Sequence, residues 1–251
     1  MRLLIANANT SLKVTDLVMQ VARRYASPEN DLVGATGAFG ARVIASRAQN
    51  AIAEHAAVDL VARHARTCDG VLLAVSYDPG LRALRELLDV PVVAITEASL
   101  LAAMMHGTRI GLIVWGQGSL GLYRELIDFY GFGSRICGLR RIDVPAPYDG
   151  GRAEALDQAA VVAAQELIET QEADIIVLIG AVLAGRSAIL EQHLPVPVVD
   201  GIRCAVPMLE AMVRVGARKA RVGSYATRGN DECVGLSLDL DGALASAPPY
   251  G

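Results

Sequence analysis

The polar residues that could do chemistry stand in short segments that follow runs of apolar residues. The first segment, 7–11, reads Asn-Ala-Asn-Thr-Ser and stands at the start of a predicted helix. Free backbone N–H groups at a helix start need acceptors, so the segment is either an N-cap or a cradle that holds a substrate carboxylate. Asn7, Asn9 and Ser11 are therefore candidate substrate-binding residues, and both interpretations stay open.

The second segment, 76–80, reads Ser-Tyr-Asp-Pro-Gly. Its proline and glycine predict a tight turn, and Asp78 before the proline is typical of a helix cap. Asp200, which follows another apolar run, is interpreted as a cap too. Ser76 and Tyr77 are not needed for the turn, so we expect them at the ligand. No histidine is spaced to activate a serine nucleophile, which favours Ser76 as a hydrogen-bond donor to an oxyanion or carboxylate.

Three more segments supply candidates. Arg42 and Ser46 lie in the glycine- and alanine-rich stretch 34–47. This stretch is either a mobile loop with a solvated helix face or a lid that carries a guanidinium to an anionic substrate. Glu97 is either a cap or a general base. Trp115 ends another apolar run and would supply an apolar wall.

The composition limits the scaffold that positions these residues. The chain has 251 residues, of which 53% are hydrophobic, and a net charge of −4. We expect no nucleic-acid partner, because there is no broad basic field, and no membrane span, because no apolar run approaches the roughly 20 residues required. The four cysteines and four histidines show no metal-ligand spacing, which predicts reduced thiols, no metal and a cytoplasmic protein without a targeting signal. Cys204 stands near the start of a predicted helix, a position that lowers the pKa of a thiol, so a reactive Cys204 is one of the alternatives.

Short apolar runs alternate with helical patterns, as in parallel α/β proteins. The predicted strands are Leu3–Ala6, Gly70–Val75, Val90–Ile95, Ile110–Val114, Ile175–Ile179, Val196–Val199 and Ala220–Gly223. The predicted helices cover roughly 11–25, 43–66, 80–88, 97–106, 118–131, 152–170, 184–193 and 203–216.

The first three strands recur in order in the second part of the chain. The stretch from Arg2 to Asp69 spans 67 positions, and its counterpart from Arg109 to Asp174 spans 65. The repeat predicts an α/β fold of two pseudo-symmetric lobes, each with a central, mostly parallel sheet flanked by helices. Residues 1–98 with about 208–251 are expected to form one lobe, and about 99–207 the other. Because ligands bind beyond the carboxyl ends of parallel strands, both halves are expected to line one cleft between the lobes.

Six segments carry a resemblance to a known family. They read NANTS, DGVLLAVSYDPGL, VPVVAITEASL, YG, RRIDVPAP and VPVVDG, at 7–11, 69–81, 90–100, 130–131, 140–147 and 196–201. Together they resemble the aspartate/glutamate/hydantoin racemase superfamily, and its hydantoin and allantoin racemase branch in particular. The resemblance implies a two-lobed α/β fold, a homo-oligomer (a dimer or larger), no cofactor, and a small anionic or cyclic-amide substrate.

The chemistry that this resemblance implies is a relay of two cysteines on opposite faces of the substrate. The cysteine positions of the family correspond here to Val75 and Gly180. The internal repeat pairs the same two positions, since each stands six residues after the aspartate that opens its segment. Neither residue can carry a proton, and Trp115 stands where the family has a threonine.

We therefore expect an enzyme of this superfamily that acts on a small carboxylate, imide or hydantoin-like substrate by oxyanion or enolate stabilisation, without the two-cysteine relay. Lyase, tautomerase or isomerase, and hydrolase chemistry all fit. Tyr77, Glu97 or a bound water would handle protons, while Val75, Gly180 and Ala181 would contact substrate. Two alternatives remain: a non-catalytic protein that still binds a small molecule, and a racemase with relocated acid and base groups.

Overall fold

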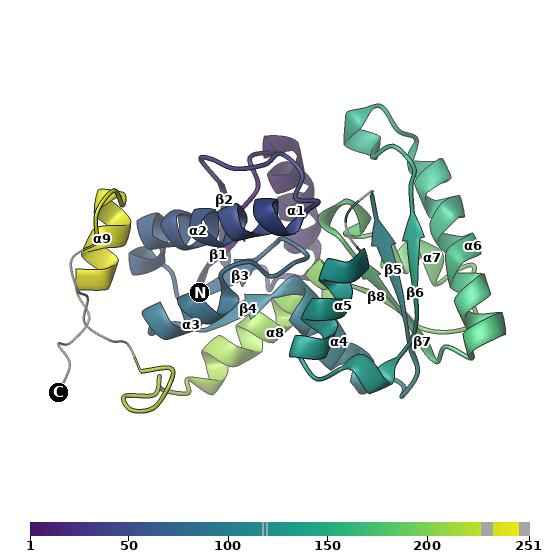
Figure 1. Ribbon diagram of the computed structural model, residues 1–251. Helices are drawn as coiled ribbons and strands as arrows, with labels where there is room; N and C mark the ends of the chain where they lie inside the picture. The colour runs from purple at the N-terminus through teal and green to yellow at the C-terminus, as the bar shows by residue number, and fades with distance from the viewer. Residues whose placement is uncertain (117, 119, 227–232, 246–251) are drawn as a thin grey trace.

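The computed structural model describes residues 1–116, 118, 120–226 and 233–245 (Figure 1). Its strands form two parallel four-stranded sheets with the same order, β2-β1-β3-β4 and β6-β5-β7-β8. The first sheet contains β1 (Arg2–Asn7), β2 (Asp31–Thr36), β3 (Gly70–Leu73) and β4 (Val92–Ala94). The second contains β5 (Ile110–Trp115), β6 (Ile136–Ile142), β7 (Ile175–Ile179) and β8 (Val198–Asp200). The predicted pair of matching α/β lobes is confirmed.

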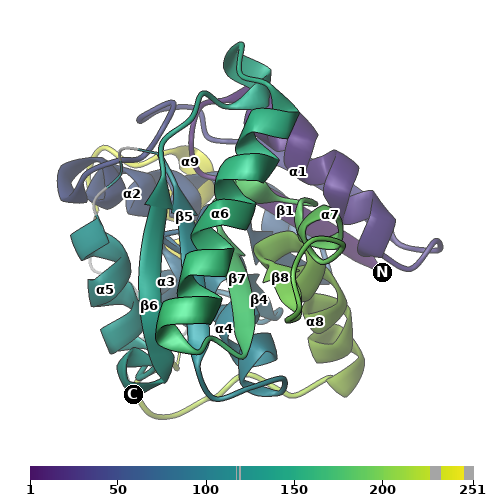
Figure 2. The same cartoon turned by 90° about the vertical axis from the view of Figure 1, so that its right-hand side faces the viewer.

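Helices cover both sheets. They are α1 (Leu12–Tyr25), α2 (Arg47–His64), α3 (Leu81–Leu87), α4 (Ile95–Met104), α5 (Leu120–Phe129), α6 (Ala153–Gln171), α7 (Ser187–Leu190), α8 (Gly201–Val215) and α9 (Leu238–Ala245). Figure 2 shows α6 lying across one face of the second sheet. Helix α9 packs against α2 at the far end of the first lobe (Figure 1). Within the described ranges, no helix is long and apolar enough to cross a membrane.

The central strands were predictable because they are buried on both faces and read as continuous apolar runs. Two edge strands, β2 and β6, were missed because their partly exposed residues include aspartate, threonine, glycine and arginine. The predicted strand Ala220–Gly223 is wrong. This segment forms bends and turns, pairs with no strand of the described chain, and leaves Val222 83% exposed.

Helices α4 and α8 join the two lobes. Each contacts strands of both sheets, and the two pack against one another. Their first residues meet so closely that a Cβ on Gly201 would lie 2.7 Å from the Cβ of Ile95, so glycine is required for this approach. The predicted lobe boundaries, near 98 and 208, fall inside these two helices and remain a prediction.

Candidate active site

A cavity of about 540 Å³ lies between the lobes, beyond the carboxyl ends of the strands. The loops after β3, β5 and β7 form its walls, together with the segments 42–45 and 143–148. Eight residues predicted from the sequence line it: Asn9, Arg42, Val75, Ser76, Tyr77, Trp115, Gly180 and Ala181. The structure does not bring Asn7, Ser11, Ser46 and Glu97 to this cavity wall.

A cluster of hydroxyl groups lies on the β3 side of the cavity. The Oγ of Ser76 lies 2.8 Å from the hydroxyl of Tyr123, and the rings of Tyr77 and Tyr123 stack with centroids 4.5 Å apart. Burial raises the pKa of Tyr123 well above its ordinary value and also raises the pKa of Tyr77. Both phenols therefore stay protonated near neutrality and are suited to donate hydrogen bonds rather than to accept protons.

Tyr123 comes from α5 and was not found by sequence reasoning. The helix itself was predicted, over 118–131, but no local motif distinguishes Tyr123 from its neighbours. Asp143 was also missed as a site residue, although it stands in a segment that matched the family. It lines the cavity as an exposed carboxylate.

Asn9 presents an amide donor because its carbonyl oxygen is already engaged. That oxygen accepts hydrogen bonds from the side-chain amide of Asn7, at 2.9 Å, and from the backbone N–H of Ser11, also at 2.9 Å. The network fixes the side-chain orientation, and the Nδ2 group of Asn9 makes no hydrogen bond in the described part of the chain. Asn9 therefore offers the cavity a hydrogen-bond donor.

Backbone amides add to this set of donors. The N–H groups of Ser76 and Tyr77, after β3, make no hydrogen bond to any described residue. The same holds for Ala181 and Val182, which open the short 3-10 turn Ala181–Leu183 after β7. Since all four residues line the cavity, it has unsatisfied donors on both walls.

Val75 and Gly180, the two positions that the family resemblance and the internal repeat single out, lie in this one cavity. Val75 is 6% exposed and contributes only methyl groups. Gly180 has a φ of +127°, and among the described residues other than its chain neighbours only the Cβ of Trp115, at 3.9 Å, lies within 4 Å of a Cβ built on it. The indole N–H of Trp115 donates to the carbonyl of Val144 at 2.8 Å, which fixes the ring in the wall.

Arg42 lines the cavity, but its guanidinium is already paired. It donates to the carboxylate of Asp149 at 2.9 and 3.1 Å, and Lys13 donates to the carbonyl of Tyr148 at 2.9 Å. These contacts hold the segment around Arg42 against the opposite lobe. An anionic substrate would therefore compete with Asp149 for the guanidinium.

Three other candidates lie outside the cavity wall. Asn7 is fully buried, and its amide donates to Asn9, to the Ser11 carbonyl and to Thr15. Ser11 precedes α1 but makes no side-chain capping bond. The Oγ of Ser46 accepts the N–H of Gln49 at 3.2 Å, as an N-cap of α2 does.

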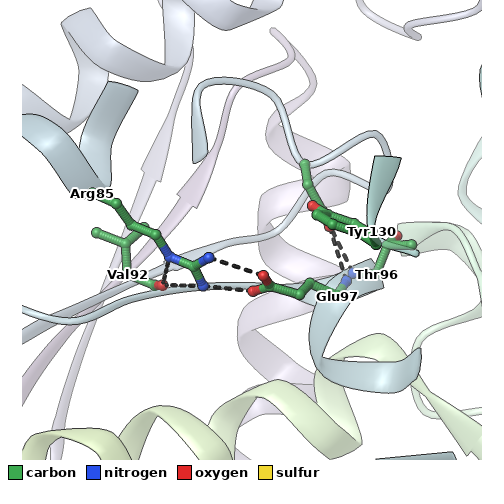
Figure 3. Close-up of polar contacts among 6 residues, drawn as sticks. Arg85, Val92, Thr96, Glu97 and Tyr130 are labelled. Atoms are coloured by element: carbon green, nitrogen blue, oxygen red, sulfur yellow. Dashed lines mark hydrogen bonds and ion pairs between the residues drawn. The ribbon is translucent and has the colours of Figure 1, made fainter. Parts of the chain in front are cut away.

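Glu97 has no geometric support as a general base in the cavity, because its carboxylate forms a bidentate ion pair with Arg85 at 2.9 and 2.5 Å. Arg85 also donates to the carbonyl of Val92, on the strand that precedes Glu97 (Figure 3). The second lobe repeats the arrangement with the charges exchanged, since Arg203 pairs with Glu191 and donates to the carbonyl of Val198. The repetition indicates a structural role.

Cys204 does not have a lowered pKa. Burial, with a smaller effect of the nearby Asp200 carboxylate, raises the pKa of this thiol to about 12. The thiol packs among apolar residues and does not line the cavity. In the described part of the chain, no three His, Cys, Asp or Glu residues lie together in a way that could hold a metal ion.

Comparisons with known proteins agree with this geometry. The family model described as Asp/Glu/Hydantoin racemase matches residues 3–209. A hydantoin racemase of Pseudomonas sp. (strain NS671) is 27% identical over 241 residues, which cover 94% of this chain and 95% of that protein.

Two solved structures have the same fold. The allantoin racemase from Klebsiella pneumoniae superimposes with a TM-score of 0.89 at 28% identity, over 96% of this chain and 98% of that one. The allantoin racemase from Pseudomonas fluorescens gives a TM-score of 0.85 at 30% identity, over 94% of this chain and 100% of that one. The protein therefore belongs to the Asp/Glu/hydantoin racemase family.

Proposed function

We propose that this racemase-family enzyme acts on a small cyclic amide, imide or carboxylate by stabilising an oxyanion or enolate, without a pair of thiols. The observation that carries the proposal is the hydrogen-bonded pair Ser76 and Tyr123, which lines the same cavity as Val75 and Gly180. The cavity therefore has hydroxyl donors, although neither Val75 nor Gly180 has a side chain that can react.

The arrangement of donors suits a carbonyl oxygen that becomes negative during the reaction. Ser76, Tyr77 and Tyr123 supply hydroxyls, Asn9 supplies an amide, and the loops after β3 and β7 supply backbone N–H groups. Donors preorganised in this way are each worth about 2.7–4 kcal/mol of transition-state stabilisation. An enolate formed from a hydantoin-like ring places its charge on such an oxygen.

The distribution of proton-carrying groups bears on the reaction type. Racemisation needs one group on each face of the reacting carbon. The loop after β7 contributes only Gly180, Ala181 and Val182 to the cavity, and none of their side chains can exchange a proton. This loop therefore favours a reaction that needs proton transfer on one side of the substrate only, as in a lyase, a tautomerase or isomerase, or a hydrolase.

The relatives favour a ring substrate. Proteins that are similar to this chain carry the names hydantoin racemase and allantoin racemase. The charges in the cavity wall also disfavour an anionic substrate. The guanidinium of Arg42 is paired with Asp149, and Asp143 adds a negative group. An uncharged cyclic amide therefore fits better than a dicarboxylate.

The proposal is tested by incubating the protein in D₂O with 5-substituted hydantoins, allantoin and dicarboxylates. Proton NMR reports exchange at the α-carbon and ring opening, and circular dichroism reports loss of optical activity. Ser76→Ala and Tyr123→Phe are each expected to lower kcat about 10²–10³-fold. Ser99→Ala is the matched control, because Ser99 is a buried serine on α4 that donates to the Thr96 carbonyl and does not line the cavity.

Several results would overturn the proposal. Unchanged rates in both Ser76→Ala and Tyr123→Phe would remove the hydroxyl pair from the mechanism. Ligand binding without turnover of any compound would identify a binding protein, and full racemisation would identify a racemase with relocated groups. Self-association and a cytoplasmic location stay predictions; the exposed side chains of Leu101, Met104 and Met105 on and just after α4 are compatible with the first.

A further inference from the structure

Asp78 follows Ser76 and Tyr77 in sequence but does not line their cavity. It is only 5% exposed, and its backbone has a φ of +48°, in the left-handed region. A buried carboxylate is costly unless its oxygens are hydrogen-bonded, and this backbone conformation adds strain. Both features indicate that the surrounding contacts hold Asp78 in place.

Those contacts come from the first turn of α4 and from Tyr130, just after α5, which are both distant from Asp78 in sequence. One carboxylate oxygen accepts the N–H of Thr96 at 3.1 Å. The other accepts the N–H of Glu97 at 2.9 Å and the hydroxyl of Tyr130 at 2.8 Å. Figure 3 shows Thr96 and Tyr130 beyond Glu97, on the side away from Arg85. Asp78 therefore caps α4, and not the adjacent α3 as the turn motif suggested, since α3 has no side-chain cap.

A second hydrogen bond ties the same two segments in the opposite direction. The hydroxyl of Thr96 donates to the backbone carbonyl of Ser76 at 2.7 Å. The loop that carries Ser76 and Tyr77 is thus fixed to the first turn of α4 at both ends. Helix α4 is itself held by the ion pair of Glu97 with Arg85 and by its packing on α8.

The second lobe uses a buried carboxylate at the equivalent junction. Asp200 caps α8 by accepting the N–H groups of Ile202 and Arg203. Its other oxygen accepts the N–H of Gly185 at 3.2 Å and the hydroxyl of Ser187 at 2.6 Å. These two residues follow the loop that carries Gly180. In each lobe one buried aspartate therefore links a cavity-wall loop to the helix that follows the last strand.

We propose that Asp78 is a positioning residue, which sets the hydroxyl of Ser76 against Tyr123 by fixing the loop 76–78 to the start of α4. The inference rests on the proposed function, because it assigns Asp78 a role through the hydroxyls of that site. Asp78 itself touches no substrate.

The test compares Asp78→Asn with a matched control, Glu210→Gln. Asparagine keeps the size of the side chain and tolerates a left-handed backbone, but it has one acceptor oxygen in place of two. Glu210 is another buried carboxylate, 4% exposed, which accepts two hydrogen bonds from Ser27, one from Asn30 and one from Arg214, and it does not line the cavity. The control matches the loss of a buried charge without touching the loop.

Asp78→Asn is expected to lower kcat about 10–100-fold while KM changes less than about threefold, since small displacements of a reacting group cost that much. Tyr130→Phe, which removes one of the three donors, is expected to give a smaller fall in kcat. Glu210→Gln is expected to keep the wild-type kcat. A crystal structure of Asp78→Asn is expected to show the contact between Ser76 and Tyr123 lengthened.

The positioning role would be overturned by an unchanged contact between Ser76 and Tyr123 in that structure, by an equal fall of kcat in Glu210→Gln, or by an unchanged kcat in Asp78→Asn when Ser76→Ala lowers it. Failure of the proposed function is a separate result, because it would appear as full activity in Ser76→Ala. In that case a displaced loop in Asp78→Asn would still support the positioning role.

Discussion

Replacement of Gly180 by alanine tests whether the backbone at this position tolerates a side chain. The residue has a φ of +127° and a ψ of +134°, a region that glycine alone enters readily. Apart from its chain neighbours, no residue that the structure describes would lie closer than 3.9 Å to a Cβ there. The cost of a side chain is therefore backbone strain and not a clash.

The size of the effect follows from two opposing contributions. A residue held in such a conformation costs about 1–3 kcal/mol, and a Gly-to-Ala change returns about 0.4–1 kcal/mol by restricting the unfolded chain. Gly180→Ala is thus expected to lower the free energy of unfolding by roughly 1–2 kcal/mol. At about 2–4 °C per kcal/mol for a chain of this size, Tm falls by about 2–8 °C.

Urea unfolding followed by far-ultraviolet circular dichroism measures the free energy, and the fluorescence of Trp115, the only tryptophan, reports on the cavity wall. Gly242→Ala is the control, because Gly242 lies in α9 outside the left-handed region. Apart from its chain neighbours and the backbone of its own helix, a side-chain nitrogen of Arg66, at 3.6 Å, is the one atom of the described residues within 4 Å of a Cβ built there. Alanine there is expected to be neutral or to stabilise by up to about 1 kcal/mol. Wild-type stability in Gly180→Ala would refute the strain argument.

Three other predictions concern the thiols, a carboxylate and an ion pair. Replacing all four cysteines by alanine or serine is expected to leave turnover within about twofold of wild type, since none of them lines the cavity. A loss of more than tenfold in steady-state assays would contradict the thiol-free mechanism. Burial raises the pKa of Asp78 to about 7, above the roughly 3.9 of an unfolded chain, so its contribution to stability is fully present below pH 4 and is lost as the pH rises to 7. Urea titrations at several pH values should therefore show stability falling over this window more steeply in wild type than in Asp78→Asn. Arg42→Ala breaks an exposed ion pair with Asp149 and is expected to change the free energy of unfolding by less than about 1 kcal/mol; a larger loss in thermal unfolding would assign this contact a structural role.

The interior of the fold was predictable because the pattern that marks a buried strand lies within the strand's own sequence. The buried central strands β1, β3, β5 and β7 read as apolar runs, and their repetition predicted two lobes and a shared cleft. The edge strands β2 and β6 could not be found in this way. Their stability comes from pairing with β1 and β5, which the local sequence does not show.

The site was less predictable because it depends on side-chain partners far apart in the chain. Asp78 has the local pattern of a cap for α3, yet its carboxylate oxygens accept hydrogen bonds from the backbone N–H groups of Thr96 and Glu97, 18 and 19 positions later. Glu97 was expected at the start of a helix, as a cap or a general base, but α4 already starts at Ile95 and the carboxylate of Glu97 pairs with Arg85. Tyr123 was invisible because only tertiary packing decides which side of α5 faces the cavity.

The meeting of α4 and α8 has a consequence for the origin of the molecule. Helix α4 follows the last strand of the first sheet yet packs on β7 and β8, while α8 follows the last strand of the second sheet and packs on β3 and β4 (Figure 1). Each half therefore packs its final helix on the sheet of the other half. Two copies of a half-length ancestor that exchanged this helix would form a domain-swapped dimer, and fusion of their genes would preserve the exchange within one chain. In such an ancestor, each copy would have packed its final helix on the sheet of the other copy.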